Sequence, residues 1–374
     1  MRKTLALLLT VLLAAVCLTG CSQRKSSPVE GKKVAYIMYM SSSSIFDLWV
    51  ESFTKTAEAL GMEADAFFCN DSDESLRSRI IRCAEDGYDG LLISHGGADY
   101  SWEFLTQVLT EYPNLKIATF DTSFRDGNGK TQTIDGVVQL FQQDSGLAAV
   151  LVEEILAMYP EKVANRECVN ILQVQEENYI IAFDRRQIGY KLYESVGKIR
   201  TLEQIAPSDH LSPVSSMEEV TKATLEKYGE GEIDAIWCCY DAYAQGVYKA
   251  LREAGSDIPM VSVDICDEDI AFMAEGLNWK ASATTNWTLN GEFACRVLAL
   301  EMAGQYDDIR KASSYYESPG MWMEIPSVLV RQEEIMSGEN ITVGNLSDVA
   351  ADAYTDSSFM PTCDWMDAAL KKRK

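Results

Sequence analysis

Residues 115–121 have the sequence LKIATFD, a short apolar run that ends in a single acid. The same pattern recurs as AIWCCYD at 235–241 and as MVSVD at 260–264. Continuous apolar runs of this length are typical of parallel strands that are buried on both faces. In open parallel sheets, ligands bind beyond the carboxyl ends of the strands. These segments therefore predict parallel sheets with ligand-binding acids along one edge.

Helical stretches separate these runs at the spacing of βα units, which predicts helices that cover parallel sheets. The run of units is interrupted by a polar loop at 122–133, so we expect two α/β lobes, and 374 residues suffice for two cores. The predicted strands are 34–40, 66–69, 90–94, 115–120, 169–174, 235–239 and 260–263. The predicted helices are 46–60, 76–85, 102–111, 147–158, 183–196, 217–227 and 242–254.

The N-terminus has the pattern of a bacterial lipoprotein signal. Arg2 and Lys3 precede an apolar run over 5–18, and the sequence LTGC at 18–21 closes it. The run is too short for a spanning helix, so we expect residues 1–20 to be a signal peptide. Cys21 is then the lipidated residue, and residues 21–33 form a tether. This predicts an extracytoplasmic protein, lipid-anchored to the bacterial cell membrane.

Composition excludes several classes of function. The formal net charge of −24 repels the phosphates of nucleic acid, so no nucleic-acid partner is expected. The chain has two histidines and neither a G-x-S-x-G nor an H-E-x-x-H motif, so we expect a protein that is not an enzyme and has no catalytic residues. Its cysteines lack C-x-x-C or zinc spacing, and no metal or other cofactor is predicted.

Eight cysteines remain after Cys17 is removed with the signal peptide and Cys21 is lipidated. Most fall in apolar strand-like or helical patterns, where a cysteine behaves as a small buried apolar residue. An exported protein could also oxidise some of them, so disulfides stay an open alternative.

Polar residues at the predicted strand ends are the first candidates for ligand contacts. They are Ser43, Ser94, His95, Asp121, Asp241 and Asp264. An acid after a strand is often only the N-cap of the next helix, but three acids at equivalent positions in two lobes favour a binding role. Carboxylates suit vicinal hydroxyls and aromatic rings suit the C–H face of a sugar, so this set favours a small polar ligand.

The sequence resembles the periplasmic sugar-binding family of ABC importers, the type I receptors that include those for ribose and galactose. The resemblance covers residues 34 to about 330. The segments that carry it are VAYIM at 34–38, DGLLI at 89–93, IATFD at 117–121, RQIGY at 186–190, IDAI at 233–236, DAYAQG at 241–246 and VSVD at 261–264.

This resemblance implies two doubly wound lobes joined by three crossings, near Gln143, Trp287 and Glu324. The N-terminal lobe would comprise 34–143 and 288–323, and the C-terminal lobe 144–287 and 324–374, including a C-terminal extension. Phe46 would pack on the sugar face, Asp121 would bridge two hydroxyls and Arg186 would grip hydroxyls or the ring oxygen. Asp241, Asp264 and Asn286 match further polar contacts.

The resemblance also implies that the protein captures a small polar ligand, expected to be a sugar, and delivers it to an ABC permease. Thr122, Tyr240 and Val263 depart from the pattern of the sugar receptors and leave the ligand's identity open. A nucleoside or another non-sugar ligand is one alternative. A sensor that presents the bound solute to a membrane histidine kinase or chemoreceptor is another.

The anchoring prediction is tested by Cys21→Ala. Without the thiol no diacylglyceryl group can be attached, so the protein should leave the membrane fraction or accumulate as an uncleaved precursor. Fractionation followed by mass spectrometry of the N-terminus measures both outcomes. Membrane retention of correctly cleaved Cys21→Ala protein would contradict the prediction.

Overall fold

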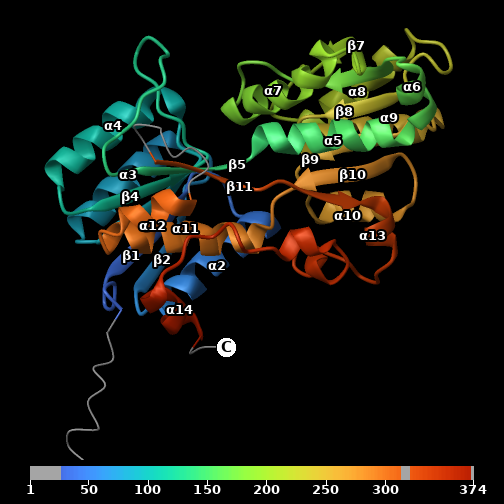
Figure 1. The fold of residues 1–374 in the computed structure, drawn as a ribbon. Helices are drawn as coiled ribbons and strands as arrows, with labels where there is room; N and C mark the ends of the chain where they lie inside the picture. The colour runs from blue at the N-terminus through green and yellow to red at the C-terminus, as the bar shows by residue number, and fades with distance from the viewer. Residues whose placement is uncertain (1–26, 313–320, 372–374) are drawn as a thin grey trace, which may run out of the picture.

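The computed structural model describes residues 27–312 and 321–371, which form two lobes side by side (Figure 1). The first lobe is built on a six-stranded sheet in the order β11-β5-β4-β3-β1-β2. All of its described pairings are parallel. Its strands are β1 (Lys33–Met38), β2 (Glu63–Phe68), β3 (Gly90–Ser94), β4 (Lys116–Phe120), β5 (Val138–Gln142) and β11 (Met321–Ile325).

The second lobe has a six-stranded sheet of the same design in the order β12-β10-β9-β8-β6-β7. It is parallel except at one edge, where β12 runs antiparallel to β10. The strands are β6 (Val169–Val174), β7 (Ile199–Ile205), β8 (Ala235–Cys238), β9 (Met260–Val263), β10 (Trp279–Thr284) and β12 (Val328–Arg331).

The chain passes between the lobes after β5, after β10 and between β11 and β12. Polar side chains connect the crossings: Thr285 Oγ1 donates to Gln142 Oε1 at 3.2 Å, and Ser327 Oγ to Gln143 Oε1 at 3.5 Å. Two helix-covered, mainly parallel sheets confirm the predicted α/β class with two doubly wound lobes.

Helices cover both sheets. Those of the first lobe are α2 (Ser44–Ala59), α3 (Asp73–Glu85), α4 (Ala98–Glu111), α11 (Trp287–Met302) and α12 (Tyr306–Ala312). Those of the second are α5 (Asp144–Met158), α6 (Pro160–Asn165), α7 (Ile181–Ser195), α8 (Pro213–Leu225), α9 (Asp241–Ala254), α10 (Asp267–Ala274) and α13 (Gln332–Met336). The chain continues through η1 (Leu346–Asp348) and η2 (Asp352–Thr355) to α14 (Asp364–Lys371).

Glycines allow three helix pairs to pack with their backbones in contact. A Cβ built on Gly291 of α11 would overlap the carbonyl oxygen of Trp49 in α2. A Cβ on Gly189 of α7 would likewise overlap the carbonyl oxygen of Ser145 in α5. A Cβ on Gly246 of α9 would overlap the carbonyl oxygen of Val214 in α8. Any larger residue there would force these helices apart, so both lobes depend on glycine at these contacts.

The eight cysteines among the described residues are all free. Cys69, Cys83, Cys238, Cys239 and Cys295 are buried, in agreement with the prediction that they act as small apolar residues. No helix within 27–312 or 321–371 is long and apolar enough to cross a membrane. Cys21 and the predicted signal peptide lie outside the described residues.

The C-terminal extension departs from the expectation that residues 324–374 belong to the second lobe. Helix α13 packs against α10 of that lobe, but α14 packs against α2 of the first. Figure 1 shows this red segment running from one lobe to the other. The helix α14 has a strongly apolar side, with Met366 fully buried, and it covers apolar surface of the first lobe.

Candidate functional site

Three residues that follow strands have a left-handed backbone. His95 after β3 has φ 62°, Asp121 after β4 has φ 43°, and Asp264 after β9 has φ 69°. This conformation is uncommon for residues other than glycine and costs on the order of 1–3 kcal/mol each. Asp121 N donates to Leu140 O and Asp264 N to Ala283 O, so each neighbouring strand holds the turn in place. Strain at equivalent points of two lobes marks this edge as a candidate binding site.

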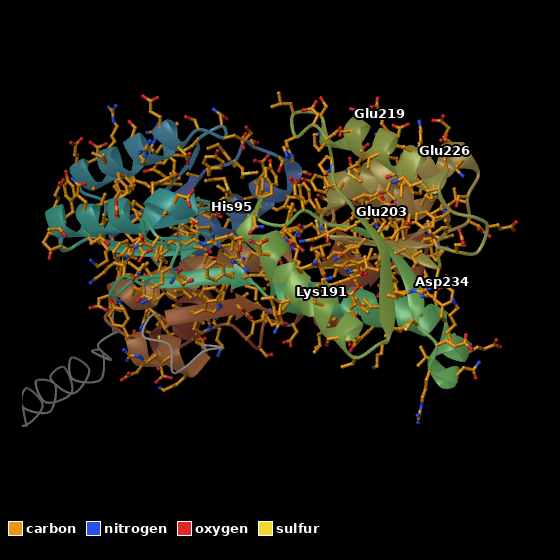
Figure 2. The ribbon with its side chains drawn as sticks, turned by 90° about the horizontal axis from the view of Figure 1, so that it is seen from above. His95, Lys191, Glu203, Glu219, Glu226 and Asp234 are labelled. Atoms are coloured by element: carbon orange, nitrogen blue, oxygen red, sulfur yellow. The ribbon has the colours of Figure 1, made fainter. Side chains whose placement is uncertain are left out.

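The wall of the first lobe combines an acid with aromatic rings. The His95 ring lies 5.6 Å from the Phe46 ring and 5.9 Å from the Trp49 ring, both edge-to-face. Its Nδ1 is 2.6 Å from Ser94 Oγ, and its Nε2 is 3.9 Å from Asp121 Oδ2. Figure 2 shows His95 near the middle of the molecule, toward the second lobe. The structure therefore brings Phe46, Ser94, His95 and Asp121 together, and their contact with a ligand remains a prediction.

Burial lowers the pKa of His95 to about 4, so the imidazole is neutral near pH 7. Its contact with Asp121 is consequently not an ion pair. Burial and then the charge of Asp144 raise the pKa of Asp121 to about 7, although Arg185 and Arg186 oppose this shift. The first lobe thus presents an acid that exchanges its proton near neutral pH.

The wall of the second lobe is organised by Arg186. Its Nε donates to Asp144 Oδ1 at 3.0 Å, its Nη1 to Cys239 O at 2.6 Å, and its Nη2 lies 3.0 Å from Asp264 Oδ2. Burial alone would lower the pKa of Arg186, but Asp264 and Asp144 raise it on balance. The guanidinium is buried with every nitrogen engaged, so Arg186 holds this wall together whether or not it also contacts ligand.

Asp264 has one oxygen for Arg186 and one without a partner. Its Oδ1 is buried and accepts no hydrogen bond within the described part of the chain. Burial raises the pKa of Asp264, and the charge of Arg186 partly offsets this effect. A buried acceptor without a donor is costly, so this atom is suited to a donor from a ligand or a water molecule.

Asp241 lies at the start of α9 and forms a buried acid pair with Asp269. Asp241 Oδ1 accepts from Ala242 N, and carboxylate oxygens of Asp241 and Asp269 lie within 4.8 Å of each other. Burial raises both pKa values, that of Asp269 to about 6, and the charge of Asp269 raises that of Asp241 further. Two neighbouring buried carboxyls of this kind share a proton. Asp241 therefore has a structural partner beside the site.

Ser43 and Asn286 occupy helix-capping positions. Ser43 is exposed, and its Oγ accepts from Phe46 N at the start of α2. Asn286 Oδ1 accepts from Leu289 N at the start of α11, and its Nδ2 donates to Tyr354 O. No described contact links either side chain to the charged groups of the site. Their predicted ligand contacts remain predictions, and capping accounts for both side chains.

Arg185 and Asp144 were missed by the sequence analysis. Arg185 Nη2 lies 2.6 Å from Asp144 Oδ2 and 3.3 Å from Asp121 Oδ1, and its guanidinium lies 4.4 Å from the centre of the Phe141 ring. Arg185 thus connects the second lobe to Asp121 of the first. Asp144 follows β5 as the other acids follow their strands, so a predicted strand at 138–142 would have drawn attention to it.

Comparisons with solved structures agree on the fold. A sugar ABC transporter protein from Yersinia enterocolitica has a TM-score of 0.71 and 24% identity, over 95% of this chain and 100% of that one. A 5-methylthioribose transporter solute-binding protein from Thermotoga lettingae has a TM-score of 0.69 and 18% identity, over 91% and 98%. A periplasmic ribose ABC transporter protein from Conexibacter woesei has a TM-score of 0.65 and 13% identity, over 83% and 96%.

No protein-family model and no curated protein sequence matches the chain. The structural similarity shows that the chain has the fold of type I periplasmic binding proteins, as the resemblance in the sequence implied. These solved neighbours are binding and transport proteins.

The raised pKa of Asp121 predicts how Asp121→Asn changes stability with pH. Between pH 4 and 7 the folded protein keeps a proton on Asp121 that the unfolded chain has lost, so this contribution to stability is lost as pH rises toward 7. Asparagine does not titrate. The unfolding free energy of the variant, minus that of the parent, should therefore increase with pH by up to about 1.4 kcal/mol per pH unit.

Urea unfolding of the unliganded protein at several pH values measures this difference. Asp126→Asn is the matched control in the same lobe: local hydrogen bonds lower the pKa of this half-buried acid, so the stability difference for Asp126→Asn should be flat above about pH 5. A difference for Asp121→Asn that stays flat above about pH 5 would show that Arg185 outweighs burial and keeps Asp121 ionised.

Proposed function

We propose that the protein is an extracytoplasmic solute-binding lipoprotein that captures a sugar or polyol between its lobes and delivers it to an ABC permease. The observation that carries the proposal is the pairing of two strained acids, Asp121 and Asp264, which belong to opposite lobes and are linked through Arg185, Asp144 and Arg186. One ligand between them would contact both lobes, which couples binding to lobe movement.

The chemistry of the two walls favours a ligand rich in hydroxyl groups. The Oδ1 atom of Asp264, which has no partner in the described part of the chain, requires a hydrogen-bond donor. Because the pKa of Asp121 is raised to about 7, its carboxyl group can accept or donate a hydrogen bond at neutral pH. The Phe46 ring is half-buried beside His95 and offers an apolar face, which suits the C–H side of a sugar ring. Both arginines already have carboxylate partners, so they offer little to an anionic ligand.

The fold neighbours support this class of ligand. Their descriptions name 5-methylthioribose, allitol, galactofuranose and ribose. The lipobox at 18–21 supports export and anchoring, and the neighbours' role in transport supports a permease as partner. The absence of catalytic motifs in the sequence favours binding over turnover.

A thermal-shift screen of pentoses, hexoses, polyols and nucleosides tests the proposal. A ligand at a hundred times its dissociation constant should stabilise the protein by about 2.7 kcal/mol, several degrees in Tm. With that ligand, Asp121→Ala should bind at least about tenfold more weakly, since hydrogen bonds to a charged group contribute about 1.5–3 kcal/mol.

Asp126→Ala, in the exposed loop of the same lobe, should bind like the parent. A screen in which sugars and polyols leave Tm unchanged while nucleosides raise it would contradict the proposed ligand class. Unchanged affinity of Asp121→Ala would contradict the proposed site.

A further inference from the structure

The C-terminal segment 339–371, here called the strap, connects the two lobes in addition to the three crossings. It is attached first to the second lobe, where Val343 N donates to Asp267 Oδ1 at 2.8 Å. Val343 and Leu346 are buried beside this contact, Leu346 completely. Apolar burial of this kind fixes the start of the strap to the lobe that carries α10 and α13.

The middle of the strap lies at the second crossing. Tyr354 in η2 is buried, and its carbonyl accepts from Asn286 Nδ2 at 2.9 Å. Asn286 also caps α11, the helix with which the chain re-enters the first lobe. Ala351 N donates to Glu334 Oε1 at 2.9 Å, so this part of the strap is still held by the second lobe.

The end of the strap is attached to the first lobe. The Phe359 ring lies 5.5 Å from the Phe293 ring of α11. Trp365 Nε1 donates to Gln305 Oε1, and Met366 of α14 is fully buried where α14 packs on α2. These contacts are independent of the three crossings.

The strap has little slack between its attachments. Residues 355–358 alone separate Tyr354 from Phe359, and the amide and hydroxyl of Ser358 both donate to the Asp356 carboxylate. A chain covers at most about 3.5 Å per residue, and this stretch is folded into a turn. A rotation that moves the two attachments apart must therefore open this turn, strain the strap or detach one of its ends.

We propose that the strap restrains the hinge: it limits the relative rotation of the lobes in the unliganded protein. The proposal requires only that the lobes move about their crossings, whatever the ligand. Its test uses unliganded protein, so its failure is distinguishable from failure of the sugar-binding proposal.

Hydrogen exchange of two variants tests the strap. One variant ends at Gly338, and the other is the full chain with Phe359→Ser and Trp365→Ser, which detach only the end on the first lobe. In both, the amides near 142–143 at the first crossing and those of Ile325 and Ser327 at the third should exchange at least about tenfold faster than in the parent. The strap lies at the second crossing, and its η2 also packs on β12 directly after the third crossing. Faster exchange at the first crossing is therefore the result that simple uncovering would not produce.

Peptides of the buried strand β3 report global unfolding, and their exchange should be unchanged in the full-length variant. Asp348→Asn, an exposed position of the strap, is the matched control and should behave like the parent. Small-angle scattering should show a broader range of lobe separations in both test variants. Unchanged exchange at the first and third crossings, with unchanged scattering, would overturn the proposal.

Discussion

The arrangement of the site depends on the ion pairs that the Asp144 carboxylate forms with Arg185 and Arg186. The carboxylate is buried at the first crossing, and its two oxygens accept from Arg185 and Arg186. Arg185 continues to Asp121 in the first lobe and Arg186 to Asp264 in the second. Removing one member of a buried ion pair typically costs about 3–5 kcal/mol, because the remaining charge is left unpaired. Asp121 and Asp264, the two acids proposed to bind ligand, are thus positioned through one residue beside the hinge.

This network explains why the site tolerates strain and burial together. Asp121 and Asp264 have unfavourable backbone angles and sit where burial raises their pKa values. Neighbouring strands hold the backbone, and two arginines supply positive charge against three acids. The residual negative charge and the partnerless oxygen of Asp264 leave acceptors for a ligand. The strained, buried acids therefore lower the stability of the unliganded protein at the positions where a bound ligand would raise it.

The sequence predicted the helices and strands that can be recognised from their own residues. Strands β3, β6 and β9 have the predicted bounds because large aliphatic residues dominate each run, although Asn170 and Gln173 lie within β6. Strand β5 was missed although its mixture of apolar residues and buried amides resembles that of β6, and its Gln139 and Gln142 are buried in the structure. Missing β5 also hid Asp144. Arg185 could not be singled out from Arg186 beside it, since their roles depend on the approach of two lobes. The return of the C-terminal segment to the first lobe likewise depends on contacts distant in sequence.

The proposed mechanism requires that one ligand is held by both lobes at once. A crystal structure of the protein with a sugar or polyol that raises its Tm would show whether it is. Ligand oxygens should lie within about 3 Å of carboxylate oxygens of both Asp121 and Asp264. A ligand that contacts only one lobe, or that binds away from both acids, would contradict the proposed mechanism.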